Sequence, residues 1–311
     1  MDRLVTIFGG GGFLGRYVAQ AIYRTGARVR IAQPHPERAF FLKPLGALGQ
    51  TQFMRTDIRE PRAVAEAVRG SDAVINLVGT FGSAMRAVHV DGARNVAEAA
   101  AAAGVEALIH ISAIGADADS RSLYGRTKAE GEAAVRAAFP AATIFRPSVL
   151  FGREDNFVNR FAGLARMLPL VPVLRGSAKF QPVYAGDAGR AIAAAALNAE
   201  AHAGKTYVLA GPQVLSMRAF NEWIGEATGH RRGLIDVPDA LGSLLARIGS
   251  FLPGAPITYD QWLMLQQDNV AREGEPGLDA FGITPTPLAA VSEGWLTSYR
   301  RNGRFAAKSP Y

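Results

Sequence analysis

Short apolar runs alternate with longer stretches of helical periodicity through the first half of the chain. The runs have the continuous hydrophobicity of buried parallel strands, whereas the stretches between them place apolar residues three or four positions apart. The pattern predicts strands at Leu4–Phe8, Arg28–Ala32, Thr51–Arg55, Ala73–Val78, Ala107–Ile111 and Ala142–Arg146, and helices at Leu14–Arg24, Pro61–Val68, Met85–Ala103 and Ser122–Ala138. Strands that alternate with helices indicate an α/β fold, in which helices cover a parallel sheet.

Between the first strand and the first helix lies a run of glycines. Gly9 allows a tight turn, Gly12 lets the backbone approach a diphosphate, and Gly15 lets the helix pack closely. The start of the helix then presents free N–H groups and a positive dipole end to the phosphates. Because the required strand and helix flank these glycines, the sequence predicts a dinucleotide site.

The pattern changes after Gly152, where prolines interrupt the alternation. An alanine-rich helix at Ala188–Ala199, a strand at Thr206–Ala210 and a helix capped by Ser216 are still predicted. We therefore expect a Rossmann-type doubly wound parallel sheet with a smaller, partly interleaved C-terminal lobe. Residues 1–152 form the dinucleotide-binding domain in this interpretation, residues 182–210 return to it, and residues 153–311 form the lobe that contacts a substrate or partner.

Composition narrows the class of protein. In 311 residues, 49% are hydrophobic and 20% charged, which is enough to build a sizeable core. There is no cysteine, so disulfides, thiolate metal sites and cysteine nucleophiles are excluded. The five histidines lie far apart without the spacing of metal ligands, and we expect no metal site.

The net charge of +7 comes from scattered residues, without a basic run of five or more, which argues against nucleic-acid binding. The positive charge could serve to bind anionic phosphates, acidic partners or a negative membrane surface, or it could serve solubility alone. The first apolar run is predicted to be a strand, so we expect no signal peptide, and no apolar run reaches the ~18 residues that span a bilayer. We expect a cytoplasmic protein whose membrane contact, if any, is peripheral.

A second group of residues could carry chemistry. Tyr124 and Lys128 are four positions apart on one helix face, and Ser112 follows the fifth strand. A lysine ammonium lowers the pKa of a neighbouring phenol and can bind the nicotinamide ribose, so that Tyr124 could act as general acid or base at a carbonyl.

Further motifs follow in a set order: Thr56-Asp57-Ile58, Asn76-Leu77-Val78-Gly79 and Arg146-Pro147-Ser148. With the glycines, Ser112 and the Tyr124/Lys128 pair, they resemble the short-chain dehydrogenase/reductase superfamily, in its extended and atypical branches, over residues 1 to about 210. The resemblance implies that Asp57 contacts adenine, that the Asn76–Gly79 segment lines the nicotinamide side and that the Arg146–Ser148 turn closes over the cofactor. The cofactor contacts that it implies are Gly9, Gly12, Phe13, Leu14, Gly15, Asp57, Ile58, Asn76, Val78, Gly79, Tyr124, Lys128, Arg146, Pro147 and Ser148.

Longer sequence segments match a narrower group of proteins. They are Phe8–Val18, Leu42–Gln50, Val74–Gly79, Phe151–Asn156, Lys179–Tyr184 and Gly282–Leu288. These segments resemble the family of nucleotide-binding accessory subunits of respiratory complex I, in a bacterial form, over nearly the whole chain. The resemblance implies tightly held, mainly structural NADPH. It also implies docking against complex I subunits near the quinone site, on the cytoplasmic face of the inner membrane.

The end of the second strand bears on the choice of dinucleotide. NAD binding favours an acidic residue there, and the chain has none at that position. Arg30, His35 or Arg38 could meet a 2′-phosphate, which favours NADPH, although Pro34 stands where an arginine would make the stronger case. Glu37 on the following turn leaves NAD open.

The sequence supports a structural role for the Tyr124/Lys128 pair about as well as a catalytic one. Active extended members carry Ser or Thr just beyond Ser112, where this chain has Ala113 and Ile114. The sequence thus favours an accessory subunit, with a free NAD(P)H-dependent reductase or epimerase as the alternative and an NADPH-sensing module as a third. The loop Arg153–Asn156 reads as an ion-paired loop rather than acid–base chemistry. The apolar segment Leu241–Leu252 fits internal packing in a generic enzyme, or a partner or membrane contact in the accessory subunit.

Overall fold

The structure is a computed structural model that describes residues 3–251, 257–301 and 303. By their contacts, the residues form two compact units. The first comprises Met1–Pro147, Ala185–Leu209 and Ala271–Thr284, and the second Ser148–Tyr184, Ala210–Val270 and Pro285–Tyr311. The contacts do not show that either unit folds on its own. The domain boundaries predicted from the sequence therefore stay a prediction.

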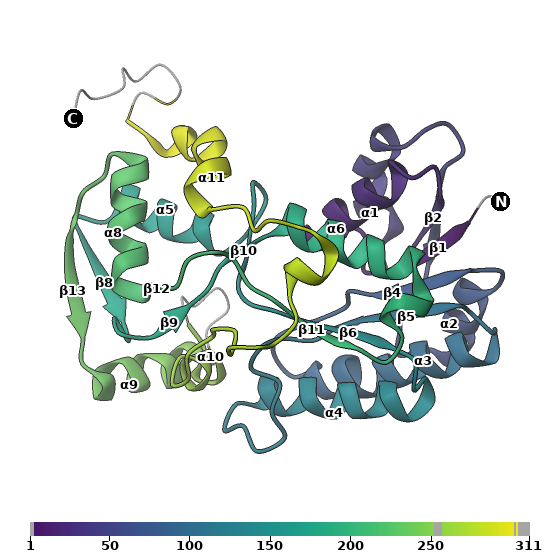
Figure 1. Cartoon of the computed structure of the whole chain (residues 1–311). Helices are drawn as coiled ribbons and strands as arrows, with labels where there is room; N and C mark the ends of the chain where they lie inside the picture. The colour runs from purple at the N-terminus through teal and green to yellow at the C-terminus, as the bar shows by residue number, and fades with distance from the viewer. Residues whose placement is uncertain (1–2, 252–256, 302, 304–311) are drawn as a thin grey trace. The chain divides into compact units, whose positions relative to one another are not determined.

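A parallel sheet of seven strands forms the centre of the first unit (Figure 1). Its strands are β1 (Leu4–Phe8), β2 (Arg28–Gln33), β3 (Thr51–Arg55), β4 (Ala73–Asn76), β5 (Ala107–Ile111), β6 (Thr143–Pro147) and β11 (Thr206–Leu209). Their order is β11-β6-β5-β4-β1-β2-β3, so the chain reverses direction across the sheet between β1 and β4. The expected doubly wound α/β fold is confirmed, and such a reversal point is where this architecture places its ligand crevice.

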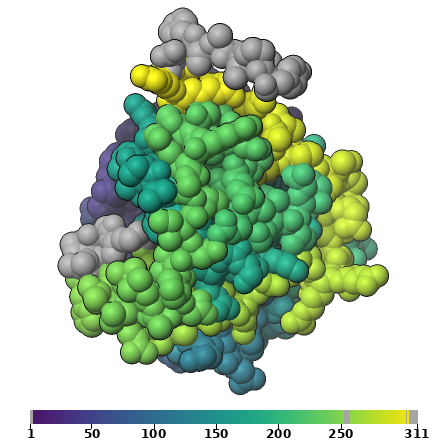
Figure 2. Space-filling view, turned by 90° about the vertical axis from the view of Figure 1, so that its left-hand side faces the viewer, coloured from purple at the N-terminus to yellow at the C-terminus, as the bar shows by residue number. Residues whose placement is uncertain are grey.

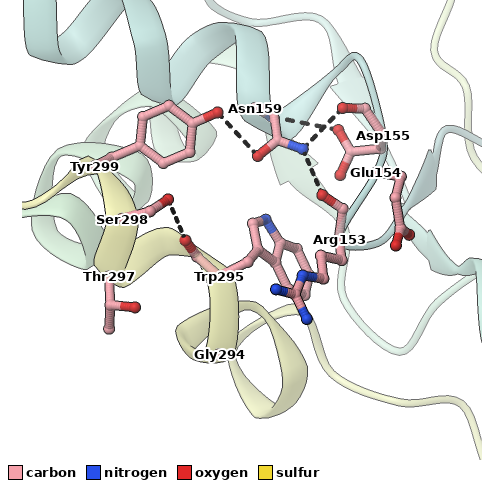
Figure 3. Close-up of a pocket in the computed structure, with 9 residues that line it drawn as sticks. All are labelled: Arg153, Glu154, Asp155, Asn159, Gly294, Trp295, Thr297, Ser298 and Tyr299. Carbon is pink, nitrogen blue, oxygen red and sulfur yellow. Dashed lines mark hydrogen bonds between the residues drawn. The ribbon is translucent and has the colours of Figure 1, made fainter. Parts of the chain in front are cut away.

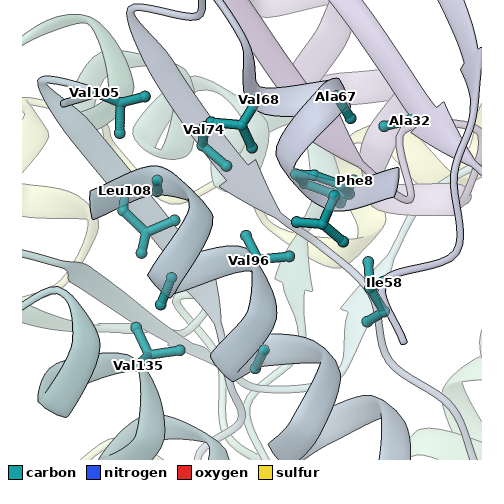
Figure 4. Packing of buried hydrophobic residues seen from close by; sticks show 14 of the residues in the cluster. Phe8, Ala32, Ile58, Ala67, Val68, Val74, Val96, Val105, Leu108 and Val135 are labelled. Carbon is teal, nitrogen blue, oxygen red and sulfur yellow. The ribbon is translucent and has the colours of Figure 1, made fainter. Parts of the chain in front are cut away.

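Helices cover both faces of this sheet. They are α1 (Phe13–Tyr23), α2 (Pro61–Val68), α3 (Ala93–Ala102), α4 (Leu123–Ala138), α6 (Ala185–Leu197) and α7 (Ala199–His202), with the short helices η1 (Pro36–Leu45), η2 (Ala87–Gly92) and η3 (Leu278–Phe281). Figure 1 shows α2, α3 and α4 against one face and α1 and α6 against the other. Between the first face and its helices, Phe8, Val74, Val96, Leu108 and Val135 form one buried cluster (Figure 4).

Several bounds differ by a few residues from the sequence prediction, and two of the differences bear on the site. The fourth strand ends at Asn76 rather than Val78, because the Asn76 side chain accepts a hydrogen bond from the Val78 N–H (3.1 Å) and turns the chain. The helix predicted over Met85–Ala103 begins at Met85, but it contains one π-helical turn, η2, before α3. Such turns often occur at functional sites.

The second unit combines short strand pairs with helices. Its strands are β7 (Leu150–Phe151), β8 (Leu170–Leu174), β9 (Lys179–Phe180), β10 (Val183–Tyr184), β12 (Leu215–Ser216) and β13 (Gly233–Val237), and its helices are α5 (Val158–Met167), α8 (Met217–Thr228), α9 (Asp239–Gly249), α10 (Tyr259–Met264), α11 (Leu288–Leu296) and η4 (Thr297–Tyr299). Phe157, Phe161, Phe180 and Phe220 pack together in its core. Within the described parts of the chain, no helix combines the length and the hydropathy that crossing a membrane requires.

Candidate functional site

The loop between β1 and α1 is a tight turn that needs glycine for different reasons at different positions. Gly9 has a φ of +76°, and its N–H donates to the carbonyl oxygen of Ala32 at the end of β2 (3.0 Å). A Cβ at Gly15 would lie 2.3 Å from the carbonyl oxygen of Gly10, which no side chain tolerates. Gly12 is exposed, so its backbone is open to an approaching group.

The N-terminus of α1 is open to an anion. No side chain caps this end of the helix, and its first turn holds no acidic residue. Phe13 and Leu14 are half-buried there, and the Phe13 ring packs edge-on against Tyr17. Uncapped N–H groups at a helix start carry positive partial charge, so this end has the chemistry that a diphosphate requires.

Gln33 joins this loop to the segment after β2. Its Oε1 accepts from the Gly11 N–H (2.8 Å), and its Nε2 donates to the carbonyl oxygen of His35 (2.6 Å). A Cβ at Gly11 would lie 2.4 Å from the same Oε1. Sequence reasoning did not single out Gln33, and the only signal for it is an amide at the last position of a buried strand.

The structure does not bring all the predicted basic residues to this edge. Arg30 lies in the middle of β2, and its guanidinium donates to two carbonyl oxygens at the end of α2 (2.7 and 2.8 Å). His35 is exposed after the strand, with its Nδ1 3.3 Å from Glu37 Oε1. Arg38 is also exposed, and its guanidinium makes no hydrogen bond or ion pair with the residues described. Of the three residues, only His35 and Arg38 lie in the exposed segment that follows the carboxyl end of β2.

After β3, Asp57 is half-buried and ionised. Arg59 donates hydrogen bonds to both of its carboxylate oxygens, and these lower the pKa of Asp57. The Ile58 side chain is buried against Gly92, where a Cβ would lie 2.5 Å from Ile58 Cδ1. The neighbouring Thr56 hydroxyl is buried and has no partner among the described residues.

The segment after β4 links the glycine loop to α4. The Val78 side chain lies against Gly9, with 3.2 Å between Val78 Cγ2 and the position of a Cβ there. At Gly79, the corresponding position lies 3.5 Å from the ammonium nitrogen of Lys128. The structure thus brings Gly9, Val78, Gly79 and Lys128 together, as the motif order suggests, without testing what they bind.

Tyr124 lies half-buried near the start of α4. Its ring stacks on Phe81 (4.8 Å between centroids) and meets His89 edge-on (5.4 Å). Burial raises the pKa of Tyr124 to about 12. The expected lowering by Lys128 is not found, because desolvation dominates, and at neutral pH the phenol is a hydrogen-bond donor rather than a base.

Lys128 is buried and anchored. Its ammonium donates to the carbonyl oxygen of Ile111 at the end of β5 (3.0 Å) and lies 5.8 Å from the Tyr124 ring centroid. Burial lowers the pKa of Lys128 to about 8, against a smaller raising effect of Glu132. At the same strand end, Ser112 is 3% exposed, and its hydroxyl has no partner among the described residues.

His89, on the π-helical turn, was not predicted as a site residue. Its Nε2 accepts from the Thr80 N–H (3.0 Å), which assigns the ring proton to Nδ1, 2.9 Å from Thr127 Oγ1. Desolvation, with the nearby Lys128 charge, lowers the pKa of His89 to about 3. The neutral ring ties the loop after Gly79 to the helix that carries Tyr124.

All three residues of the Arg146–Ser148 turn are bound to partners away from the glycine loop. Arg146 forms two hydrogen bonds to Glu132 on α4 (2.8 and 2.6 Å), while Pro147 ends β6 and accepts from the Ile114 N–H (3.2 Å). Ser148 begins the second unit, where its hydroxyl donates to Asn269 Oδ1 (2.6 Å).

The donors present at the carboxyl edge fit a dinucleotide. An exposed Gly12 precedes uncapped helix amides, an amide-anchored loop follows β2, and the hydroxyls of Thr56 and Ser112 are buried without partners. Buried polar atoms without partners are uncommon in native proteins. The residues present therefore fit a bound group that supplies phosphates to the loop and hydrogen-bonding atoms to the strand ends.

The comparison with protein families gives a match over most of the chain. Residues 5–210 match the pattern described as the NAD dependent epimerase/dehydratase family. This span covers the first six strands of the sheet, β11 and the segments between them.

Two curated relatives align along almost the whole chain. NADH dehydrogenase (ubiquinone) 1 alpha subcomplex subunit 9 of Rattus norvegicus mitochondria is 36% identical over 310 residues, which cover 96% of this chain and 80% of the rat protein. The mitochondrial NADH-ubiquinone oxidoreductase 40 kDa subunit of Neurospora crassa is 31% identical over 312 residues, with the same shares covered.

Among solved structures, the NADPH-dependent quinone oxidoreductase QOR2 of Escherichia coli, in complex with NADPH, has a similar fold. The TM-score is 0.77 at 21% identity, and 94% of this chain and 99% of that chain are covered. At this identity the likeness concerns the fold.

Proposed function

The chain belongs to the NAD dependent epimerase/dehydratase family, and from that premise we propose that it is an accessory subunit of respiratory complex I that holds NADPH as a largely structural group. The observation that carries the proposal is the alignment with two NADH:ubiquinone oxidoreductase subunits, which runs through both units of the chain. A match to the dinucleotide fold alone would stop near residue 210.

The choice of NADPH is supported by the segment after β2. Gln33 occupies the strand end where an NAD-binding protein has an acidic residue, and it is bound to the glycine loop. The exposed guanidinium of Arg38 and the exposed ring of His35 follow within five residues. A guanidinium recognises phosphate in a bidentate manner, so Arg38 is the residue that we assign to the 2′-phosphate.

In this proposal the site positions the cofactor more than it reacts with it. NADPH, when bound, supplies a hydride donor. Tyr124, protonated at neutral pH, and Lys128, tethered to Ile111, would hold the nicotinamide ribose, while Asp57 would contact the adenine end. Ala113 and Ile114 offer no hydroxyl to orient a substrate carbonyl.

A free NAD(P)H-dependent reductase or epimerase is the second candidate. It is favoured by one observation: Tyr124 and Lys128 are both in place, with 5.8 Å between the ammonium and the ring centroid. A donor phenol can protonate a carbonyl oxygen during hydride transfer. This activity would require a substrate, and the chain itself does not indicate one.

Helix α9 supports docking to a larger assembly. Its small residues Gly242, Ala246 and Gly249 are buried, and a Cβ at Gly242 would lie 2.7 Å from Trp262. Its large residues face outward instead: Leu241, Leu244, Leu245 and Ile248 are 48–54% exposed. An ordinary surface helix has the opposite arrangement.

The sequence left open that this segment packs internally, as in a generic enzyme. For its large side chains that interpretation is wrong, because they are exposed. Figure 2 shows α9, in light green, at the surface of the second unit; Leu252, at the end of the apolar segment, lies outside the described residues. We assign this face to the contact with complex I or the adjoining membrane surface, on the cytoplasmic face of the inner membrane and near the quinone site. Exposed apolar faces of this kind mark interaction sites.

The test replaces leucines on that face. Leu244→Glu with Leu245→Glu should release the chain from detergent-solubilised complex I while leaving its thermal unfolding and nucleotide content unchanged, because neither side chain is buried. Arg247→Glu, on the same helix but outside the apolar stripe, is the matched control. Retention of the double variant in the complex at the wild-type level would contradict the assignment of this face.

A further inference from the structure

The second unit contains a cavity of about 660 Å³ between the start of α5 and the end of α11 (Figure 3). Its walls come from two segments far apart in the sequence, Arg153–Asn159 and Gly294–Tyr299. Cavities of this volume are typical of small-molecule sites. The cavity belongs to neither the glycine loop nor the α9 face.

One wall is held rigidly by Asp155. The carboxylate is buried and accepts hydrogen bonds from the backbone N–H groups of Gly152 (3.0 Å), Val158 (2.6 Å) and Asn159 (3.3 Å). Asp155 therefore caps α5. The sequence predicts that this loop is held by ion pairs, and for Asp155 that prediction is wrong, because its carboxylate binds backbone N–H groups instead. Asn159 then accepts from the Tyr299 hydroxyl (3.1 Å), which joins this wall to the opposite one.

Two donor side chains, Trp295 and Arg153, line the cavity. The indole Nε1 of Trp295 is buried, and no acceptor for its N–H exists among the described residues. The guanidinium of Arg153 makes no hydrogen bond or ion pair within the described ranges. Arg153 is an exposed residue, so its guanidinium can donate to water, and the buried indole N–H of Trp295 is the donor left without an acceptor.

We propose that this cavity binds a small organic anion, whose phosphate or carboxylate oxygens accept from Arg153 and Trp295 while its apolar part lies against the Trp295 and Tyr299 rings. In Figure 3 the Trp295 and Arg153 side chains lie between the two wall segments, whereas the Glu154 side chain lies apart from them. Arginine is suited to oxyanions because its planar fork matches their geometry. A buried indole N–H requires an acceptor, which an oxyanion supplies.

The indole of Trp295 provides a local readout. The chain has three tryptophans, so the indole region of a two-dimensional ¹H–¹⁵N spectrum of the full chain should hold three signals, and the one absent in Trp295→Phe belongs to Trp295. Phenyl phosphate and benzoate are the probes, since they share a ring and differ in the anionic head. Benzyl alcohol, which has the ring without the charge, is the control ligand.

The Trp295 signal should shift in a saturable way with phenyl phosphate or benzoate and stay in place with benzyl alcohol. In Arg153→Gln the half-saturating concentration should rise at least tenfold, because a charged hydrogen-bond partner is lost. Arg231→Gln removes the same charge from an exposed position of the same unit and should behave as wild type. The head that saturates at lower concentration identifies the class of anion.

The proposal is overturned if the Trp295 signal does not move with either anion up to ~10 mM, well above the range of a weak millimolar complex. An equal shift with benzyl alcohol, or an unchanged half-saturating concentration in Arg153→Gln, would also overturn it. Phosphate bound at the glycine loop would not produce the Arg153-dependent shift, so this result is independent of the proposed NADPH site.

Discussion

Gly15 faces Gly10 so closely that a Cβ added to Gly15 would lie 2.3 Å from the Gly10 carbonyl oxygen. Both sides of this contact are backbone, and no side-chain movement can relieve it. The contact sets where α1 begins relative to the loop and keeps its uncapped amides beside the exposed Gly12.

Gly15→Ala should therefore impair both stability and nucleotide binding. We expect the free energy of unfolding to fall by about 2 kcal/mol, as in other overpacked positions, and the NADPH dissociation constant to rise at least tenfold. Gly163→Ala in α5, where no atom lies within 4 Å of the added Cβ, should instead be neutral or stabilising by about 1 kcal/mol. Urea unfolding and calorimetric titration measure both quantities, and wild-type NADPH affinity in Gly15→Ala would contradict the assigned site.

Arg38→Gln tests the choice between NADPH and NADH. Loss of the guanidinium should weaken NADPH binding at least tenfold and leave NADH binding unchanged, because only NADPH has the 2′-phosphate. Arg24→Gln removes an equally exposed charge at the end of α1 and serves as the control. Equal losses for both nucleotides in Arg38→Gln would show that the residue does not read the 2′-phosphate.

Tyr124→Phe separates the accessory subunit from the free reductase. In the accessory subunit, the variant should keep its nucleotide and its place in the complex, since the ring still stacks on Phe81. In a reductase, the loss of the proton donor should lower turnover ~10²-fold or more. A hydride-transfer activity that depends on the Tyr124 hydroxyl would overturn the structural role of NADPH.

Two buried histidines make stability depend on pH. Burial lowers the pKa of His89 and of His110 to about 3 in the folded chain, so both stay neutral while the unfolded chain protonates them below its pKa of 6.5. Stability should thus be lost as the pH falls from 7 to 5, by roughly 2 kcal/mol for each histidine. His110→Gln should reduce this loss by about that amount, and His35→Gln, an exposed control, should not. Equal losses in wild type and His110→Gln would contradict the burial effect.

Much of the first unit could be predicted from the sequence because its signals are local. Leu4–Phe8, Thr51–Arg55 and Ala107–Ile111 are strands with the predicted bounds, since each is a continuous apolar or β-prone run. The carboxyl edge could be assigned for the same reason: parallel strands place their following loops together. The roles of those residues, in contrast, depend on distances that no spacing reveals.

Arg30 and Gln33 illustrate that limit. Arg30 is a basic residue of the second strand, yet its guanidinium is hydrogen-bonded to the end of α2. Gln33 carries no motif, yet it is the residue that fixes the glycine loop. Each depends on a partner more than 20 residues away.

The C-terminal part was less predictable because its contacts are long-range. Residues 271–284 pack in the first contact unit, where the Val208 N–H donates to the carbonyl oxygen of Pro276 (2.9 Å), and no local pattern of the sequence indicates this contact. In α9 the apolar pattern was evident, but which face is buried depends on Trp262. Small residues pack where a bulky partner already fills the space.

Co-migration on a native gel tests the central claim most directly. The tagged chain would be expressed in its source organism, membranes extracted in mild detergent, and the band with NADH:quinone oxidoreductase activity examined for the tag. We predict that the chain co-migrates with this band in a one-to-one ratio to its subunits. A chain found wholly outside the active band would contradict the accessory-subunit assignment and favour the free reductase.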